Sequence, residues 1–254
     1  MLPVILSLSV SVLLPLWILR MKKDDPFPRG TVIRLLLAGV LSSFVSAFVS
    51  IVGAVAVFVL DYGTEPILQL FEDPVAAVGT LSEIASGRTF SPVVSFIRTF
   101  IIIGVCEEIF KYLFAKGVIR RKQVRTTGMN VLLCMAITAI GFQMCEDIAY
   151  SSGSVVTAIV RALTPFHFTL TAVMGYYLVR ARMNGKKAGT LLGLLISSLL
   201  HALFDFSIKS LVHEDLYILL FIFMTVLLLV LTVVMILKIR KWNRDGTMDA
   251  EIEL

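Results

Sequence analysis

The sequence predicts an all-α fold, a polytopic membrane helical bundle with about seven transmembrane helices. Of the 254 residues, 57% are hydrophobic and only 16% are charged, and the mean hydropathy is +0.91. Those values lie outside the range of ordinary soluble domains. Seven apolar stretches reach about 18 residues, the length that crosses a bilayer core of roughly 30 Å. They cover residues 2–19, 35–60, 94–115, 129–150, 159–179, 188–208 and 217–237.

Charge predicts the orientation of these stretches. Four connections, 20–34, 116–125, 180–187 and 238–244, hold 18 of the 23 Lys and Arg residues, and all four fall on one side if the stretches alternate. The positive-inside rule then places the N-terminus outside and the C-terminus in the cytoplasm, in a multi-pass protein of the cell membrane. The net charge of +5 therefore marks loops and does not indicate a nucleic-acid partner.

The remaining segments predict little beyond the bundle. The first stretch lacks a positive n-region and a small-x-small cleavage site, so we interpret it as a retained helix and not a signal peptide. Residues 1–242 form one transmembrane domain, and residues 243–254 form a polar cytoplasmic tail that we expect to be frayed. In the long outer loop, residues 65–71 fit a short interfacial amphipathic helix. The three cysteines show no CxxC spacing, so they indicate neither a disulfide framework nor a zinc ribbon.

Among the ionisable side chains inside the apolar stretches, where each charge costs at least a few kcal/mol, seven form the candidate set. They are Glu107, Glu108, Lys111, Glu146, His167, His201 and Asp205. They occupy four different stretches, and depth at about 1.5 Å per residue places the three glutamates, the two histidines and Asp205 in the middle or outer half of the membrane. One polar cavity that opens outward accommodates the whole set.

The first group indicates acid–base chemistry. Lys111 lies four residues after Glu107 and three after Glu108, so its ammonium reaches either carboxylate on a helix. One Glu stays ionised beside the ammonium, while burial and the neighbouring charge favour the protonated form of the other. Two carboxyls in different protonation states suit general acid–base chemistry on water. The structural alternative is a buried ion pair that only fixes helix packing.

The other groups add polar side chains on separate helices. Phe142 and Glu146 share a face, although a carboxylate near the outer end of its stretch is also explained by solvation. His167 follows Pro165, which frees a backbone carbonyl and bends a helix toward a cavity. His201 and Asp205 are four apart, so the carboxylate can orient the imidazole.

In this order, the motifs resemble the PrsW family of intramembrane proteases, within the superfamily of CAAX prenyl proteases and bacteriocin-processing enzymes. The matching elements are Glu107-Glu108-Ile-Phe-Lys111, Phe142-Gln-Met-Cys-Glu146, His167 with Gly175, and His201-Ala-Leu-Phe-Asp205. Lys111 and Glu146 replace residues of the CAAX-type pattern and favour the PrsW branch. Asp147 stands where the family often has Asn.

The resemblance implies an endopeptidase that cuts membrane-anchored proteins within the lipid bilayer, an anti-sigma factor being one candidate substrate. Glu107 or Glu108 would activate water, with the other as its proton partner. His201, oriented by Asp205, would stabilise the oxyanion and His167 would complete the water site, with Lys111 and Glu146 as supporting charges.

The cofactor stays open at this point. Glu107, Glu108, His167 and His201 offer two carboxylates and two imidazoles, a set that can ligate zinc. The chain has no HExxH motif on one helix. We therefore favour a metal-independent, glutamate-type mechanism, with zinc as the candidate metal.

Other classes of protein bury similar residues. A proton- or ion-coupled transporter does so, although such proteins usually show broken or repeated helices, and we find no internal repeat. A haem protein using His167 and His201, or a seven-helix sensor without catalysis, also fits these residue types.

Overall fold

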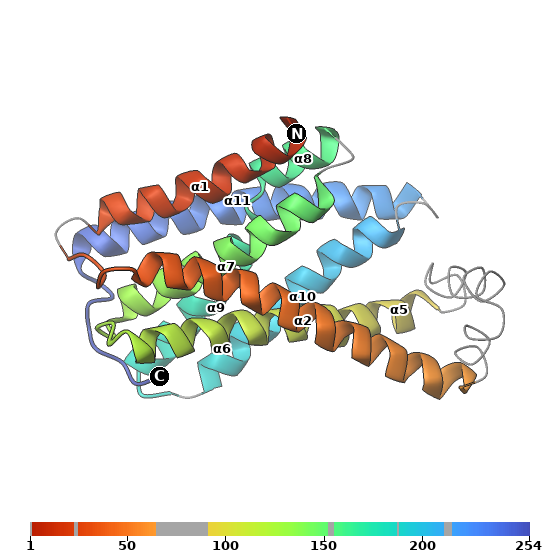
Figure 1. Cartoon of the computed structure of the whole chain (residues 1–254), viewed down its shortest axis with the longest axis horizontal. Coiled ribbons are helices and arrows are strands. Elements are labelled where there is room, and N and C mark those ends of the chain that lie inside the picture. Colours follow the sequence, from red (N-terminus) through yellow and green to blue (C-terminus); the bar gives the residue numbers. More distant parts are fainter. Residues whose placement is uncertain (1, 23–24, 65–90, 152–154, 187, 211–214) are drawn as a thin grey trace.

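The computed structural model describes residues 2–22, 25–64, 91–151, 155–186, 188–210 and 215–254 (Figure 1). Within these ranges the chain is helical apart from turns and one isolated bridge between Thr127 and Glu251. The elements are α1 (Leu2–Met21), α2 (Thr31–Tyr62), α5 (Pro92–Arg98), η1 (Thr99–Val105), α6 (Cys106–Arg121), α7 (Gly128–Tyr150), α8 (Val155–Leu163), α9 (Phe166–Met183), α10 (Ala188–Ser210) and α11 (Asp215–Asp245). The predicted all-α bundle is confirmed. The loop segment 65–71 and His213 lie outside the described residues.

Six helices of the described chain are long and apolar enough to cross a membrane. They correspond to every predicted stretch except 94–115. That stretch is nevertheless helical, because α5, η1 and α6 follow one another without a break from Pro92 to Arg121. The charges of Glu107, Glu108 and Lys111 make it less apolar than the other six.

The fifth predicted stretch is divided at Pro165, as the sequence suggested. α8 ends at Leu163, and α9 begins at Phe166. Proline has no N–H to continue the helical ladder. α8 packs against α1 and α7, beside α1 in Figure 1, while α9 packs mainly against α7 and α10.

Helix α7 lies in the middle of the bundle and contacts α1, α2, α6, α8 and α9 (Figure 1). It is buried along most of its length, so its apolar residues form much of the core. Its crossing with α2 is especially close. A Cβ on Gly141 would overlap the carbonyl oxygen of Leu36, and one on Gly39 would overlap that of Thr138. Small residues allow this approach between membrane helices.

The contact between α9 and α10 is built in the same way. Gly189, Gly193, Ser197, His201 and Asp205 recur every four residues along α10 and so share one face. A Cβ on Gly193 would lie 2.8 Å from the carbonyl oxygen of Met174 on α9. The face that carries His201 is therefore held close to α9.

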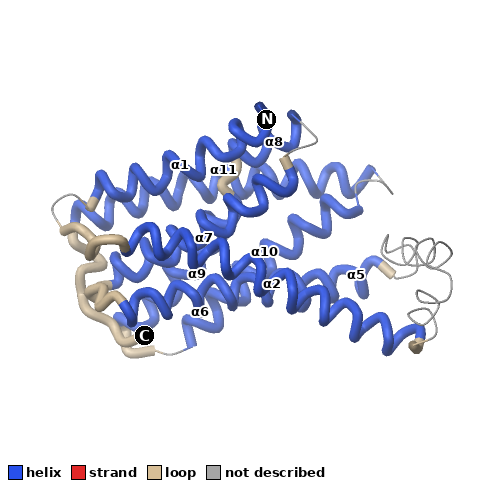
Figure 2. The backbone as a smooth tube through the Cα atoms, viewed as in Figure 1, coloured by secondary structure: helices blue, strands red, loops and turns tan. Residues whose placement is uncertain are grey.

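The four basic connections gather at one end of the bundle, where the helix ends and described loops meet (Figure 2). This arrangement agrees with the expected alternation of the helices. The assignment of that end to the cytoplasm stays a prediction.

The C-terminal tail is folded onto this end, so the expectation of a frayed tail was wrong. The backbone N–H groups of Gly128 and Met129 donate to the carbonyl oxygens of Ala250 and Met248, at 3.0 and 2.8 Å. The side chains of Met248 and Ile252 are buried. The first N–H groups of a helix lack hydrogen-bond acceptors within it, and the carbonyl oxygens of the tail serve as acceptors for those of α7.

We expect Gly141→Ala to lower the free energy of unfolding by about 1–3 kcal/mol or more, because the added methyl group forces α2 and α7 apart. Thermal unfolding of the purified protein in one detergent measures the change. Gly117→Ala is the matched control, since nothing lies within 4 Å of a Cβ there. Equal melting temperatures for the two variants would contradict the close crossing.

Met248→Ala should cost about 2 kcal/mol of stability, because it deletes a buried side chain from the tail contact. Glu253→Ala, at an exposed tail position, serves as the control. Both variants are compared by thermal unfolding, and a neutral Met248→Ala would indicate that the tail contributes nothing to the fold.

Candidate functional site

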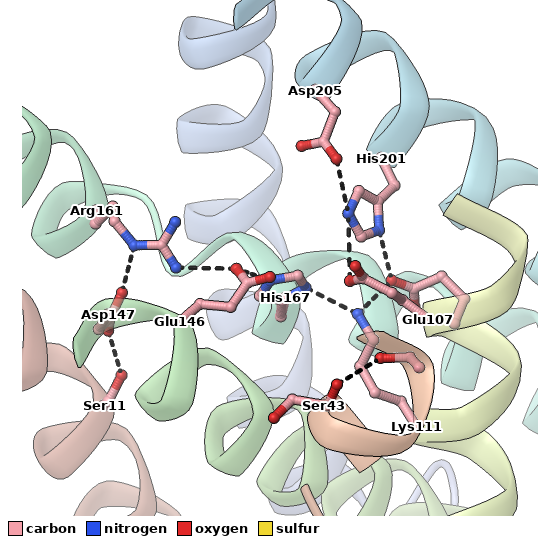
Figure 3. Close-up of polar contacts among 12 residues, drawn as sticks. Ser11, Ser43, Glu107, Lys111, Glu146, Asp147, Arg161, His167, His201 and Asp205 are labelled. Atoms are coloured by element: carbon pink, nitrogen blue, oxygen red, sulfur yellow. Dashed lines mark hydrogen bonds and ion pairs between the residues drawn. The ribbon is translucent and has the colours of Figure 1, made fainter. Parts of the chain in front are cut away.

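The structure brings all seven sequence-predicted residues into one polar network between four helices (Figure 3). Glu107, Glu108 and Lys111 come from α6, Glu146 from α7, His167 from α9, and His201 and Asp205 from α10. Phe166 packs against both imidazoles, with its ring centroid 4.8 Å from each, and the two imidazole centroids are 5.3 Å apart. The ionisable groups of distant stretches therefore form a single site.

A π-helical segment, η1, positions the two glutamates. It ends at Val105, directly before α6. Such widened turns are rare and occur frequently at functional sites. The hydroxyl of Ser50 on α2 donates to the carbonyl oxygen of Ile102 in η1, at 2.8 Å. A Cβ on Gly104 would lie 2.6 Å from the carbonyl oxygen of Ser198, so this glycine lets α10 approach the helix that carries Glu107.

Glu108 is held by three donors and is fully buried. Its Oε1 accepts from Lys111 Nζ at 2.6 Å and pairs with His201 Nδ1 at 3.2 Å. Its Oε2 accepts from the hydroxyl of Thr171 at 3.1 Å. A carboxyl surrounded in this way is ionised and fixed, because a carboxylate accepts hydrogen bonds without donating any.

Lys111 also determines the tautomer of His167. Its Nζ lies 2.8 Å from His167 Nδ1, and an ammonium can only donate, so Nδ1 carries the lone pair. The proton then sits on Nε2, which donates to Glu146 Oε2 at 2.7 Å. Phe142 completes the arrangement, because the Lys111 ammonium lies 4.4 Å from its ring centroid.

Glu107 differs from Glu108 in having an unengaged oxygen. Its buried Oε2 has no hydrogen-bond partner among the described residues and lies 3.6 Å from His201 Nε2. Asp205 Oδ2 is also 3.6 Å from that nitrogen, beyond hydrogen-bond length. The expected orientation of His201 thus comes first from Glu108. Glu107 and Asp205 are 13% and 24% exposed, so the network opens on their side.

Sequence reasoning missed Arg161, which extends the network beyond the predicted set. This α8 residue donates from Nη2 to Glu146 Oε2 at 3.0 Å and from Nε to Asp147 Oδ1 at 2.6 Å. Asp147, the residue that departs from the family pattern, is thus part of this network. Its Oδ2 also accepts from the hydroxyl of Ser11 on α1 at 3.2 Å (Figure 3). The available signal was that Arg161 is the one Lys or Arg between 159 and 179.

Gly175, the other residue of the third motif, is a packing position. A Cβ there would lie 3.5 Å from the sulfur of Met135 and 3.7 Å from Leu132, both on α7. Its role is to let α9 lie against α7, which places His167 beside Glu146.

Glu107, His167 and His201 each offer one ligand atom, and these atoms lie within 4.8 Å of one another. Two ligands of a tetrahedral zinc ion are about 3.4 Å apart, near the 3.6 Å between Glu107 Oε2 and His201 Nε2. Glu108 accepts from His201 Nδ1, the usual carboxylate support for a metal-binding imidazole. The donors fit zinc, with Glu107 and His201 ready to bind and His167 engaged by Lys111 and Glu146. Glu108, expected as a fourth ligand, has both oxygens engaged.

Three curated relatives are similar to part of this chain, and each is named Protease PrsW. The protein from Oceanobacillus iheyensis is 30% identical over 120 residues, 45% of this chain and 56% of the relative. The Bacillus subtilis protein is 32% identical over 123 residues, 46% and 56% of the two chains. The Halalkalibacterium halodurans protein is 32% identical over 114 residues, 43% and 53%. The chain spans about half the length of the curated relatives it matches.

No solved structure matches the chain. A sequence model of the PrsW family of intramembrane metalloproteases matches residues 28–235, which include every helix that contributes to the catalytic candidates. The description as metalloproteases favours a metal over the metal-independent mechanism expected from the sequence. With a match over most of its length, this multi-pass membrane protein belongs to the PrsW family.

Proposed function

We propose that this protein is an intramembrane endopeptidase that hydrolyses peptide bonds of membrane-anchored proteins. The observation that carries the proposal is the Glu107 carboxylate oxygen that accepts no hydrogen bond from the described residues and lies 3.6 Å from His201 Nε2, in a site between four helices. The relatives named as proteases support the reaction class. The network reaches the surface at its carboxylates, since Glu107, Glu146 and Asp205 are 13%, 20% and 24% exposed, and a peptide would enter there.

In the site without a metal, Glu107 is the general base of the proposed reaction. Its free oxygen can accept a proton from water, and the low dielectric of the site strengthens that interaction. Glu108 does not suit this role, because Lys111, Thr171 and His201 already occupy its oxygens. It acts instead as the fixed negative charge that orients His201.

His201 stabilises the negative charge that develops on the scissile carbonyl oxygen. Carboxylate oxygens lie 3.2 Å from its Nδ1 and 3.6 Å from its Nε2, so both ring nitrogens face acceptors. Its Nδ1–H stays with Glu108, so Nε2–H is the donor that faces the substrate side. Because the ring is already oriented, donation requires little reorganisation.

The same atoms can hold a metal. Glu107 and His201 would be its ligands, and His167 would join them once its Nδ1 is released from Lys111. A zinc ion bound there would acidify water and polarise the scissile carbonyl. In that form, the chain's own contributions are the support of His201 by Glu108 and that of His167 by Glu146.

We expect Glu107→Gln to reduce cleavage about 100-fold or more without unfolding the protein, because it removes the base and leaves the buried ion pair intact. Glu108→Gln should abolish cleavage and also cost about 3–5 kcal/mol of stability, since it leaves the Lys111 charge without its partner. The assay is co-expression with a panel of tagged single-pass membrane proteins at equal enzyme level, followed by thermal unfolding.

Glu251→Gln is the matched control for both variants, because Glu251 is exposed at the opposite end of the bundle. If the Glu107→Gln variant cleaves substrate at the wild-type rate, Glu107 is not the base. Cleavage that survives Glu107→Gln, Glu108→Gln and His201→Ala alike would exclude the whole site from catalysis.

Chelation should eliminate cleavage by the purified protein, and added Zn²⁺ should restore it, because two of the three metal ligands are ready to bind. Metal analysis should find about one zinc ion per wild-type chain and a clear loss in His201→Ala. His213→Ala, at the remaining histidine of the sequence, should keep the metal. Full activity in the chelated, metal-free protein would favour the metal-independent mechanism.

A further inference from the structure

We propose that Arg161 is a positioning residue that, through Glu146, holds His167 in the orientation in which Lys111 selects its Nε2–H tautomer. The proposal rests on the proposed function for its effect on turnover, while the structural effect on His167 stands independently of it. Arg161 touches none of the candidate catalytic residues in the described chain and acts one contact away from them, as Figure 3 shows.

One oxygen atom links Arg161 to the site. Glu146 Oε2 accepts from Arg161 Nη2 at 3.0 Å and from His167 Nε2 at 2.7 Å. The carboxylate oxygen is therefore held between a guanidinium and an imidazole. Because both hydrogen bonds use this oxygen, a rotation of Glu146 that moves it away from Arg161 also changes its distance from His167.

Glu146 depends on this cation for its position. Its other partner in the site is the imidazole of His167, whose Nδ1 faces the Lys111 ammonium. A carboxylate without a cation at this depth gains by turning toward solvent, and Glu146 is 20% exposed. Arg161 supplies the opposing charge that keeps Glu146 turned inward.

Arg161 is itself fixed from a second side. Its Nε donates to Asp147, which is fully buried and also accepts from Ser11 of α1. The guanidinium fork thus bridges two adjacent carboxylates in a fixed plane, a geometry that a flexible ammonium cannot reproduce. The break at Pro165 makes this contact available, because it separates α8 from α9 and lets α8 pack on α1 and α7.

The result is a set orientation of the imidazole. With Nε2–H directed to Glu146, the His167 Nδ1 lone pair points to Lys111. Loss of Arg161 releases Glu146, and His167 can then rotate or exchange its proton between the two nitrogens. The site loses a defined acceptor without losing any residue that contacts substrate.

Histidine NMR tests the proposal directly, because the chain has only 3 histidines. The full-length chain is labelled with ¹⁵N in its imidazoles and placed in lipid nanodiscs, with chelator present, and His167→Ala assigns the signals. Wild type should show His167 as a neutral ring protonated on Nε2. Arg161→Ala should give a mixture of tautomers, and Arg161→Lys should recover the Nε2–H form only in part, because it restores one of the two charged contacts.

Ser11→Ala is the matched control. It loosens the contact between α1 and α7 by removing the bond to Asp147, but it leaves Arg161 and Glu146 in place. The His167 signals should match those of wild type. A shift in Ser11→Ala equal to that in Arg161→Ala would reduce Arg161 to a structural anchor and overturn the proposal.

Cleavage gives the second measurement. Arg161→Ala should lower kcat about tenfold with KM nearly unchanged, and Arg161→Lys should recover part of kcat. If wild type cleaves no substrate but His167 still depends on Arg161, the proposed protease function fails and the positioning role stands. If His167 keeps its Nε2–H form in Arg161→Ala, or the wild-type ring is protonated elsewhere, the positioning role is overturned whatever the cleavage result.

Discussion

The ion pair between Glu108 and Lys111 is the interaction on which the rest of the site depends. Both side chains are completely buried, with Nζ and Oε1 2.6 Å apart. Either charge alone at this depth would be strongly destabilising, so the pair is stable only because further hydrogen bonds engage both members. Those bonds come from Thr171 and His167 of α9 and from His201 of α10. Satisfying one buried ion pair therefore aligns three helices and orients both imidazoles.

Close approach of the helix backbones makes such a network possible. Hydrogen bonds of about 3 Å between side chains on different helices require crossings that bulky residues would prevent. Gly141 provides this at α2 and α7, Gly193 at α9 and α10, and Gly104 where η1 meets α10. The π-helical turn adds to this, because it comes directly before Glu107 and changes the direction in which α6 presents its first residues. The close packing of the apolar helices is thus what allows the hydrogen bonds of the polar site to form.

Local spacing explains why part of the site was predictable and part was not. Lys111 reaches Glu108 because residues three apart share a helix face, and Pro165 interrupts its helix because it lacks an N–H, so both followed from the sequence. The docked tail and the contact between Arg161 and Glu146 join segments far from each other along the chain or in separate helices. No periodicity encodes such pairings. Even the partner of His201 changed, because Glu108 from another helix lies closer than Asp205 on its own.

The sequence by itself determined that the chain is an all-α membrane protein, which residues are polar inside it, and to which family their order is similar. Hydropathy and residue type are sufficient for these conclusions, since a buried charge stands out against an apolar stretch wherever its partner lies. Only the tertiary structure decided which partners each group has. It left one oxygen of Glu107 free while engaging both oxygens of Glu108, and it brought Arg161 to the edge of the site. The physical reason is that a side chain's role depends on the donors and acceptors within about 3 Å, and those come from helices whose relative placement follows from packing.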